Sequence, residues 1–196
     1  MSDNYEPMSN EDKKFLIELS KESARRKILN WNLTASKIAK DLEQRIEKDI
    51  FQQHLACFIT ITNEDDELRG CMGSMLPTRP LWKDVVLNSI ATATRDWRFD
   101  PIQRAELDKC FFEITILSDF NEIQGPENIE IGKHGLYIES GKDNRGILLP
   151  QVAEEFDMEP EDFIEAVCVK ADLRLDAVQS GSATLKTFTA LECFSG

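Results

Sequence analysis

The chain has 196 residues, and its 23 Lys and Arg against 36 Asp and Glu give a formal net charge of −13 at pH 7. A chain of this length normally forms one domain and can bury a core without disulfides or metal ions. The surplus of negative charge disfavours the phosphate backbone of nucleic acids and anionic membrane surfaces as main partners.

The cysteine pattern and the N-terminus both indicate a reducing compartment. Five cysteines, an odd number with no CxxC pair, favour free thiols over disulfides, zinc ribbons or iron–sulfur motifs. The N-terminus lacks a signal sequence, and no apolar run approaches the roughly 18 residues of a membrane-spanning helix. With only His54 and His134 available, a multi-histidine metal site is excluded, although a mixed site with Cys or carboxylates is not. We therefore expect a cytoplasmic protein that contacts no membrane and needs no metal or cofactor.

The first fifty residues are predicted to be mainly helical. Residues 1–8 are polar, and we expect them to be loose. Ser9 followed by Asp12 matches a capping box, and apolar residues at helical spacing continue to about Asn30. Apolar residues then recur every four positions over 38–50, which predicts a second helix.

The middle of the chain alternates strands and a helix. A β-branched run predicts a strand over 55–62, and the polar residues 63–67 predict a turn. Residues 68–76 are predicted to be the partner strand, 81–97 a helix and 110–118 a further strand.

The C-terminal third contains shorter elements. Strands are expected near 128–131, 136–139 and 146–149, helices over 151–156 and 160–171, and a final strand over 184–194. Helices separate the strands irregularly, so the predicted fold class is α+β with an antiparallel or mixed sheet flanked by helices.

The segment Leu68–Gly73, LRGCMG, is the first candidate for a functional site. Gly70 and Gly73 suggest a β-bulge or a close backbone approach, and they would let a ligand come near Cys71. Arg69 would share a strand face with Cys71 and favour its reactive thiolate form. The simpler alternative is a small core cysteine beside a bulge.

The end of the predicted central helix is rich in charge. Arg95 and Arg98 could hold an anionic substrate through bidentate hydrogen bonds, with Asp96 between them. The alternative is that these are cations favoured at a helix C-terminus, one of them paired with Asp96.

Two further candidates lie in the C-terminal third. His134 could act as a base or a ligand, or could be an ordinary turn residue. Gln151 follows an apolar strand at a helix N-terminus, which is a natural site for an anion. The alternative there is a packed strand–helix junction.

Four segments occur together in the order LRGCMG (68–73), TRDWRFDPI (94–102), KHGLYI (133–138) and GILLPQVAEEF (146–156). Their combination resembles the AMMECR family, also called protein A of the AmmeMemoRadiSam system. The resemblance covers roughly residues 50–194, although two Pro and a Gly common in the family are replaced here by Trp97, Asp100 and Asp172.

The resemblance implies a fold, a set of partners and a place for the site. Residues 9–196 would form a two-lobed α+β domain with a smaller second lobe, and the LRGC segment would lie in or near a groove between the lobes. Family members are found beside a Memo-type protein and a radical SAM protein, which are the partners implied here. This chain lacks the CxxxCxxC motif of a radical SAM enzyme.

Three functions follow as hypotheses. In the first, the protein is a small enzyme or ligand-handling subunit in which Cys71 is a nucleophile or redox thiol. Arg69 and Arg98 would stabilise its thiolate or an anionic substrate, and His134 would be a general acid or base. In the second, it is a non-catalytic adaptor for the Memo-type and radical SAM proteins. In the third, which the net charge disfavours, it regulates nucleic acid. The arginines also predict a positive patch beside Cys71.

Overall fold

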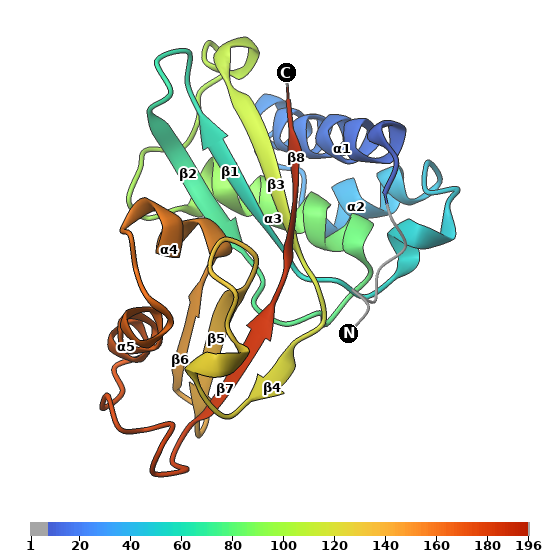
Figure 1. Ribbon diagram of the computed structural model, residues 1–196. Coiled ribbons are helices and arrows are strands. Elements are labelled where there is room, and N and C mark those ends of the chain that lie inside the picture. The colour runs from blue at the N-terminus through green and yellow to red at the C-terminus, as the bar shows by residue number, and fades with distance from the viewer. Residues whose placement is uncertain (1–7, 196) are drawn as a thin grey trace. The chain divides into compact units, whose positions relative to one another are not determined.

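The computed structural model describes residues 8–195, and the chain divides into two compact units (Figure 1). Of the described residues, the larger unit contains 8–116 and 191–195, and the smaller unit contains Leu117–Ala190. Residues 1–7, most of the segment expected to be loose, lie outside the described part. Met8 is described, and it is buried in the core of the larger unit. No helix between residues 8 and 195 is long and apolar enough to cross a membrane.

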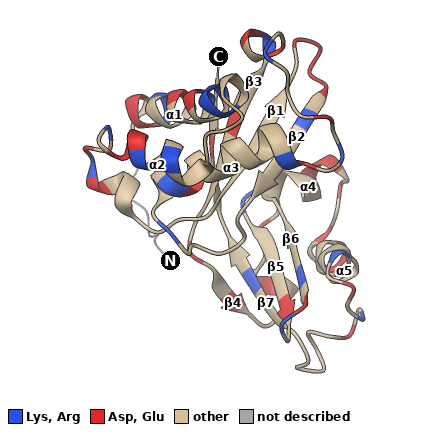
Figure 2. Ribbon diagram, turned by 180° about the vertical axis from the view of Figure 1, so that it is seen from behind, with Lys and Arg blue, Asp and Glu red and all other residues tan. Residues whose placement is uncertain are grey.

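The larger unit is built on a four-stranded sheet with helices on one face (Figures 1 and 2). The strand order is β2-β1-β3-β8, and β1 pairs antiparallel with both neighbours. The strands are β1 (Cys57–Thr62), β2 (Leu68–Gly73), β3 (Phe111–Leu117) and β8 (Ala190–Phe194). The helices are α1 (Asn10–Leu29), α2 (Ala35–Glu43) and α3 (Leu81–Arg95), with short 3₁₀ turns at Asp49–Gln52 and Leu107–Lys109.

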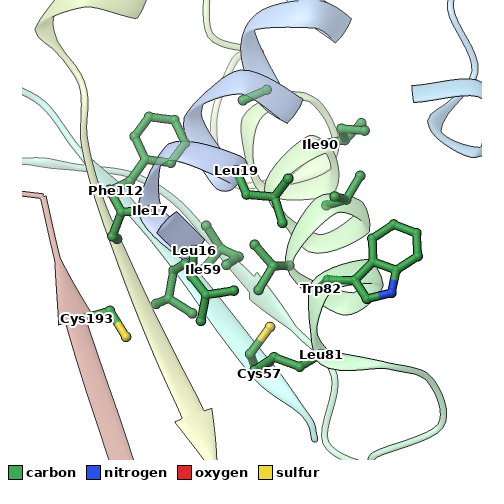
Figure 3. Close-up of a cluster of buried hydrophobic side chains, with 14 of the residues drawn as sticks. Leu16, Ile17, Leu19, Cys57, Ile59, Leu81, Trp82, Ile90, Phe112 and Cys193 are labelled. Carbon is green, nitrogen blue, oxygen red and sulfur yellow. The ribbon is translucent and has the colours of Figure 1, made fainter. Parts of the chain in front are cut away.

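Alternation along β1 explains why the sheet has two different faces. Cys57, Ile59 and Ile61 are buried, whereas Phe58, Thr60 and Thr62 are partly exposed. The buried set faces α3, and we call this the inner face of the sheet. The opposite side is called the outer face. The inner face and the three helices form a continuous apolar core, part of which is shown in Figure 3.

Helix α1 begins as its sequence predicts. The Ser9 hydroxyl accepts a hydrogen bond from the Asp12 N–H, and the Asp12 carboxylate accepts one from the Ser9 N–H. This reciprocal pair satisfies two backbone donors at the start of the helix.

The smaller unit contains the second four-stranded sheet, in the order β4-β7-β5-β6, with all described pairs antiparallel. Leu136, Ile138 and Leu185 on one face of it pack with Phe163 and Val167 of a helix. The elements are β4 (Asn121–Ile123), a 3₁₀ turn (Pro126–Asn128), β5 (Gly135–Ser140), β6 (Asn144–Leu148), α4 (Pro150–Glu155), α5 (Pro160–Lys170) and β7 (Thr184–Phe188).

The second predicted helix is too long. Helix α2 ends at Glu43, and the N–H groups of Arg45 and Ile46 bond carbonyls three residues back instead of four. The apolar series continues into the separate 3₁₀ turn at Asp49–Gln52, where Ile50 is buried. Apolar residues that recur every four positions can therefore be buried without belonging to one continuous helix.

Two strand predictions are also wrong. Residues 128–131 contain no strand, because a 3₁₀ turn ends at Asn128 and the carbonyl of Glu130 closes the next turn with the His134 N–H. The predicted final strand over 184–194 is divided at Thr189 into β7 and β8, which belong to different sheets. Alternation of apolar and polar residues indicates that the chain is extended, but it does not indicate which sheet the strand joins.

Candidate functional site

Cys71 lies on β2, an edge strand of the larger unit. It is directly opposite Thr60 of β1, and the Thr60 hydroxyl donates a hydrogen bond to its sulfur at 3.4 Å. Directly opposed residues of antiparallel strands point to the same side, so Cys71 shares the outer face with Thr60. Of the five cysteines, Cys71 alone is not buried. Burial raises the pKa of each of the other four thiols, that of Cys193 to about 11.

The main chain of Cys71 is held by two side chains from the loop after α3. Its N–H donates to Oδ2 of Asp96 at 2.8 Å, and Nη2 of Arg98 donates to its carbonyl at 3.0 Å. Arg98 also donates to both carboxylate oxygens of Asp96, at 2.9 and 2.7 Å. An edge strand normally leaves such backbone groups unpaired, and here the Asp96–Arg98 pair takes the place of a neighbouring strand. These two residues therefore fix the position of Cys71.

The Asp96 carboxylate is ionised in this arrangement. It is 5% exposed, and its hydrogen bond from Arg98 holds its pKa well below the usual range, against the opposing effect of burial. The N–H of Cys71 lowers this pKa further. The two charges of the pair balance each other.

Arg69 is paired with a carboxylate from the loop before β3. The β1–β2 register shifts between Ile61 and Thr62, which leaves Arg69 as the extra residue of a bulge and interrupts simple alternation on β2. Its guanidinium donates to Oε1 of Glu106 at 3.0 and 2.8 Å. Burial raises the pKa of Glu106, but hydrogen bonds from the Gln103 N–H and Arg69 outweigh it and lower the pKa overall.

Ion pairs between arginines and carboxylates reduce the positive charge of the patch that the sequence predicted beside Cys71. Arg69 is paired with Glu106 and Arg98 with Asp96. Acidic and basic residues are interspersed in the same way along α1 and α2 (Figure 2). At two of the three arginines on which the prediction depended, a carboxylate therefore offsets the positive charge.

Close packing explains why both glycines of the LRGCMG segment lack a side chain. A Cβ on Gly70 would lie 2.6 Å from the backbone oxygen of Thr92 on α3, and one on Gly73 would lie 2.5 Å from the ring of Phe58. Both the bulge and the close approach expected from the sequence are present. The side of Gly70 that lacks a side chain is therefore occupied by α3, and the role of the two glycines in ligand binding stays a prediction.

The remaining predicted site residues belong to the smaller unit. Nδ1 of His134 accepts a hydrogen bond from the Glu130 N–H at 3.1 Å, so a neutral His134 carries its proton on Nε2. Gln151 is the second residue of α4, after Pro150. The cluster around Cys71 is built from the larger unit alone.

Sequence reasoning missed three residues of this region: Thr60, Glu106 and Asp84. Asp84, on the first turn of α3, is 1% exposed and accepts hydrogen bonds from the Cys57 N–H at 3.1 Å and the Ser74 hydroxyl at 2.8 Å. Burial raises its pKa. A carboxylate on the apolar side of a predicted helix was the available signal for Asp84. Thr60 had none, because its contact with Cys71 depends on strand register. Glu106 falls where the resembled family's pattern expects it, but that pattern does not indicate its contact with Arg69, which depends on the path of a loop.

No three His, Cys, Asp or Glu side chains gather into a group able to hold a metal ion within the described part of the chain.

The chain was compared with protein families, curated proteins and solved structures. A family model described as AMMECR1 matches residues 22–193. A protein of Aquifex aeolicus is 39% identical over 165 residues, which cover 81% of this chain and 83% of that protein. Protein Mbar_A1807 of Methanosarcina barkeri is 36% identical over 177 residues, covering 87% and 83% of the two chains. The crystal structure of the uncharacterized protein PH0010 from Pyrococcus horikoshii has a TM-score of 0.79 at 26% identity, with 94% of this chain and 92% of that chain covered. This agreement over most of the chain shows that the protein belongs to the AMMECR1 family.

Proposed function

We propose that the protein is a small enzyme or ligand-handling subunit that uses Cys71 as its reactive thiol. The observation that carries this proposal is the contrast between the main chain of Cys71 and its sulfur. Asp96 and Arg98 hold the main chain on both sides, whereas Cys71 as a residue is only partly buried and its sulfur accepts a hydrogen bond from a hydroxyl. A fixed backbone beneath an accessible nucleophile is the preorganisation that covalent catalysis needs.

The chemistry is that of a thiol nucleophile. Cys71 would give its proton to a base, and its sulfur would add to a carbonyl carbon of the substrate while the π pair of the C=O bond moves to the oxygen, which takes up that proton. The Thr60 hydroxyl, which donates to this sulfur at 3.4 Å, would stabilise and orient the thiolate. His134 is proposed as the acid or base.

Alkylation kinetics test this proposal. The folded protein would be treated with iodoacetamide, and modification of each cysteine peptide would be followed by mass spectrometry at fixed pH. Cys71 is expected to react faster than free cysteine, with the four buried thiols protected until the protein unfolds. Asp96→Asn should slow the reaction of Cys71, whereas Glu161→Gln, on exposed α5 surface, should not. Reaction of Cys71 no faster than that of free cysteine would contradict a catalytic thiol.

A second candidate is the adaptor, and one observation favours it. Trp97 is 90% exposed in the loop between Asp96 and Arg98. A large exposed aromatic ring beside an arginine is typical of the centre of a protein–protein interface. The proposed partners are the Memo-type and radical SAM proteins, in the cytoplasm. Trp97→Ala should weaken co-purification of either partner by about tenfold or more, and Cys71→Ala should leave it unchanged. Equal binding by the Trp97 variant would exclude this role for the loop.

A further inference from the structure

A hollow of about 290 Å³ lies on the outer face of the larger unit's sheet, and its lining includes Thr60, the residue opposite Cys71. Its walls come from the larger unit, which supplies residues of β1, the β1–β2 turn, β3 and the C-terminal end of β8. The residues that matter for its chemistry are Thr60, Thr62, Asp66, Phe111, Glu113 and Phe194.

The hollow is connected to Cys71 through one residue. Thr60 pairs with Cys71 on one side and with Glu113 on the other, so the three side chains form a row across three neighbouring strands. Directly opposite side chains on one face have Cβ atoms about 5 Å apart. Because Thr60 both lines the hollow and donates to the sulfur, a ligand in the hollow would lie beside the thiol.

The walls combine aromatic and anionic groups. Phe111 is 43% exposed and Phe194 is 62% exposed, and both line the hollow. Glu113 and Asp66 also line it, and no Lys, Arg or His is among the lining residues that the structure describes. Glu113 receives a weak hydrogen bond from Thr115 at 3.4 Å. Burial raises its pKa, and the nearby Glu192 raises it further, so a bound positive charge would stabilise the ionised carboxylate.

We propose that this hollow binds a small organic cation, which carries an ammonium group and a carbonyl carbon on an aromatic or aliphatic body, as the substrate of the Cys71 site. The ammonium would lie against Glu113, where aromatic faces add cation–π attraction, and the body would lie against Phe111 and Phe194. The volume is at the lower end of small-molecule pockets, which suits a single amine rather than a nucleotide or a peptide. This inference rests on the proposed function, because it names the substrate class for the same thiol.

Calorimetry on the full chain with phenethylamine as the probe tests the inference. Phenethylamine should bind, whereas its neutral analogue 2-phenylethanol and the anion phenylacetate should bind at least about tenfold more weakly, as expected for loss of a charged hydrogen bond. Glu113→Gln keeps the shape of the side chain and should remove that preference. Glu161→Gln, an equivalent change on exposed α5 surface, should preserve it. Equal binding of the three probes, or an unchanged preference in the Glu113 variant, would overturn the inference.

A second measurement separates this inference from the proposed function. Bound phenethylamine should slow alkylation of Cys71 in the wild-type protein but not in the Glu113→Gln variant. If Cys71 is reactive and phenethylamine neither binds nor protects it, the inference fails and the reactive thiol stands. If phenethylamine binds through Glu113 but Cys71 reacts no faster than free cysteine, the cation site stands and the proposed function fails.

Discussion

At the scale of single residues, the site depends on a charged pair that acts on backbone atoms. Asp96 and Arg98 contact the N–H and the carbonyl of Cys71. The sequence predicted these residues as ligands for a substrate, and in the fold both are engaged in holding the reactive residue. Asp96 and Arg98 are therefore positioning residues, because they bond the backbone of the edge strand and influence the chemistry of Cys71 only through that strand.

Asp96→Asn tests the positioning role through stability and its pH dependence. The variant should lower the free energy of unfolding by about 1–3 kcal/mol at pH 7, because a buried charge-assisted hydrogen-bond acceptor is lost. The folded-state pKa of Asp96 lies below its unfolded value near 3.9, so its contribution is complete above about pH 5 and is lost progressively as the pH falls further. Urea denaturation from pH 7 to pH 2 should therefore show the two proteins converging at low pH.

The exposed Asp143→Asn serves as the control for that series. It should follow the wild-type stability curve at every pH. A constant gap between the Asp96 variant and wild type down to pH 2 would contradict an ionised Asp96 as the source of the difference.

At the scale of elements, the LRGCMG segment is shaped by its contact with α3. The Thr92 hydroxyl donates to the carbonyl of Ile59 at 3.2 Å, and the Thr92 backbone oxygen lies where a side chain on Gly70 would be. Helix and edge strand therefore touch through their backbones. Any side chain at position 70 would separate β2 from α3 and would move Cys71 with the strand.

Gly70→Ala should be destabilising by about 1–3 kcal/mol, as is typical when a methyl group is forced into a packed core. Thermal unfolding would measure the loss, and Cys71 alkylation would report whether the thiol has moved. Thr92→Ala in the Gly70→Ala background should give little rescue, because the nearest obstacle is a backbone oxygen at 2.6 Å. Full rescue would show that the Thr92 side chain, and not the helix backbone, requires the glycine.

The local sequence pattern was sufficient to predict most of the helices and strands, but it was insufficient to predict which of them contact one another. The capping box at Ser9, the β1–β2 hairpin and the long helix α3 each follow from short-range periodicity and turn chemistry. The sequence also singled out Cys71, Asp96 and Arg98. It could not show that they meet through backbone hydrogen bonds, because such contacts leave no mark on residue spacing. The contact of Arg69 with Glu106 was equally hidden, since it depends on a bulge and a distant loop.

At the scale of the whole molecule, the path of the chain makes its C-terminal residues part of the larger unit. After the smaller unit ends at Ala190, β8 joins the β2-β1-β3 sheet, and its Cys193 is buried in the same core as Leu16 and Ile59. Ser195 bonds the main chain of Phe112 with both its hydroxyl and its N–H. The sheet that carries Cys71 is thus completed by the last strand of the chain.

Deleting residues 190–196 should therefore unfold or loosen the larger unit while the smaller unit keeps its own sheet. The deletion exposes the edge of β3 and removes the buried Cys193, and β4, β5, β6 and β7 do not depend on β8 for their pairing. Hydrogen exchange should show lost protection for β1 and β3 amides, with β5 amides retaining theirs, and Cys110 and Cys57 should become open to alkylation. Undiminished protection of β3 in the truncated chain would show that three strands and their helices suffice, and that β8 serves only to form the hollow through Phe194.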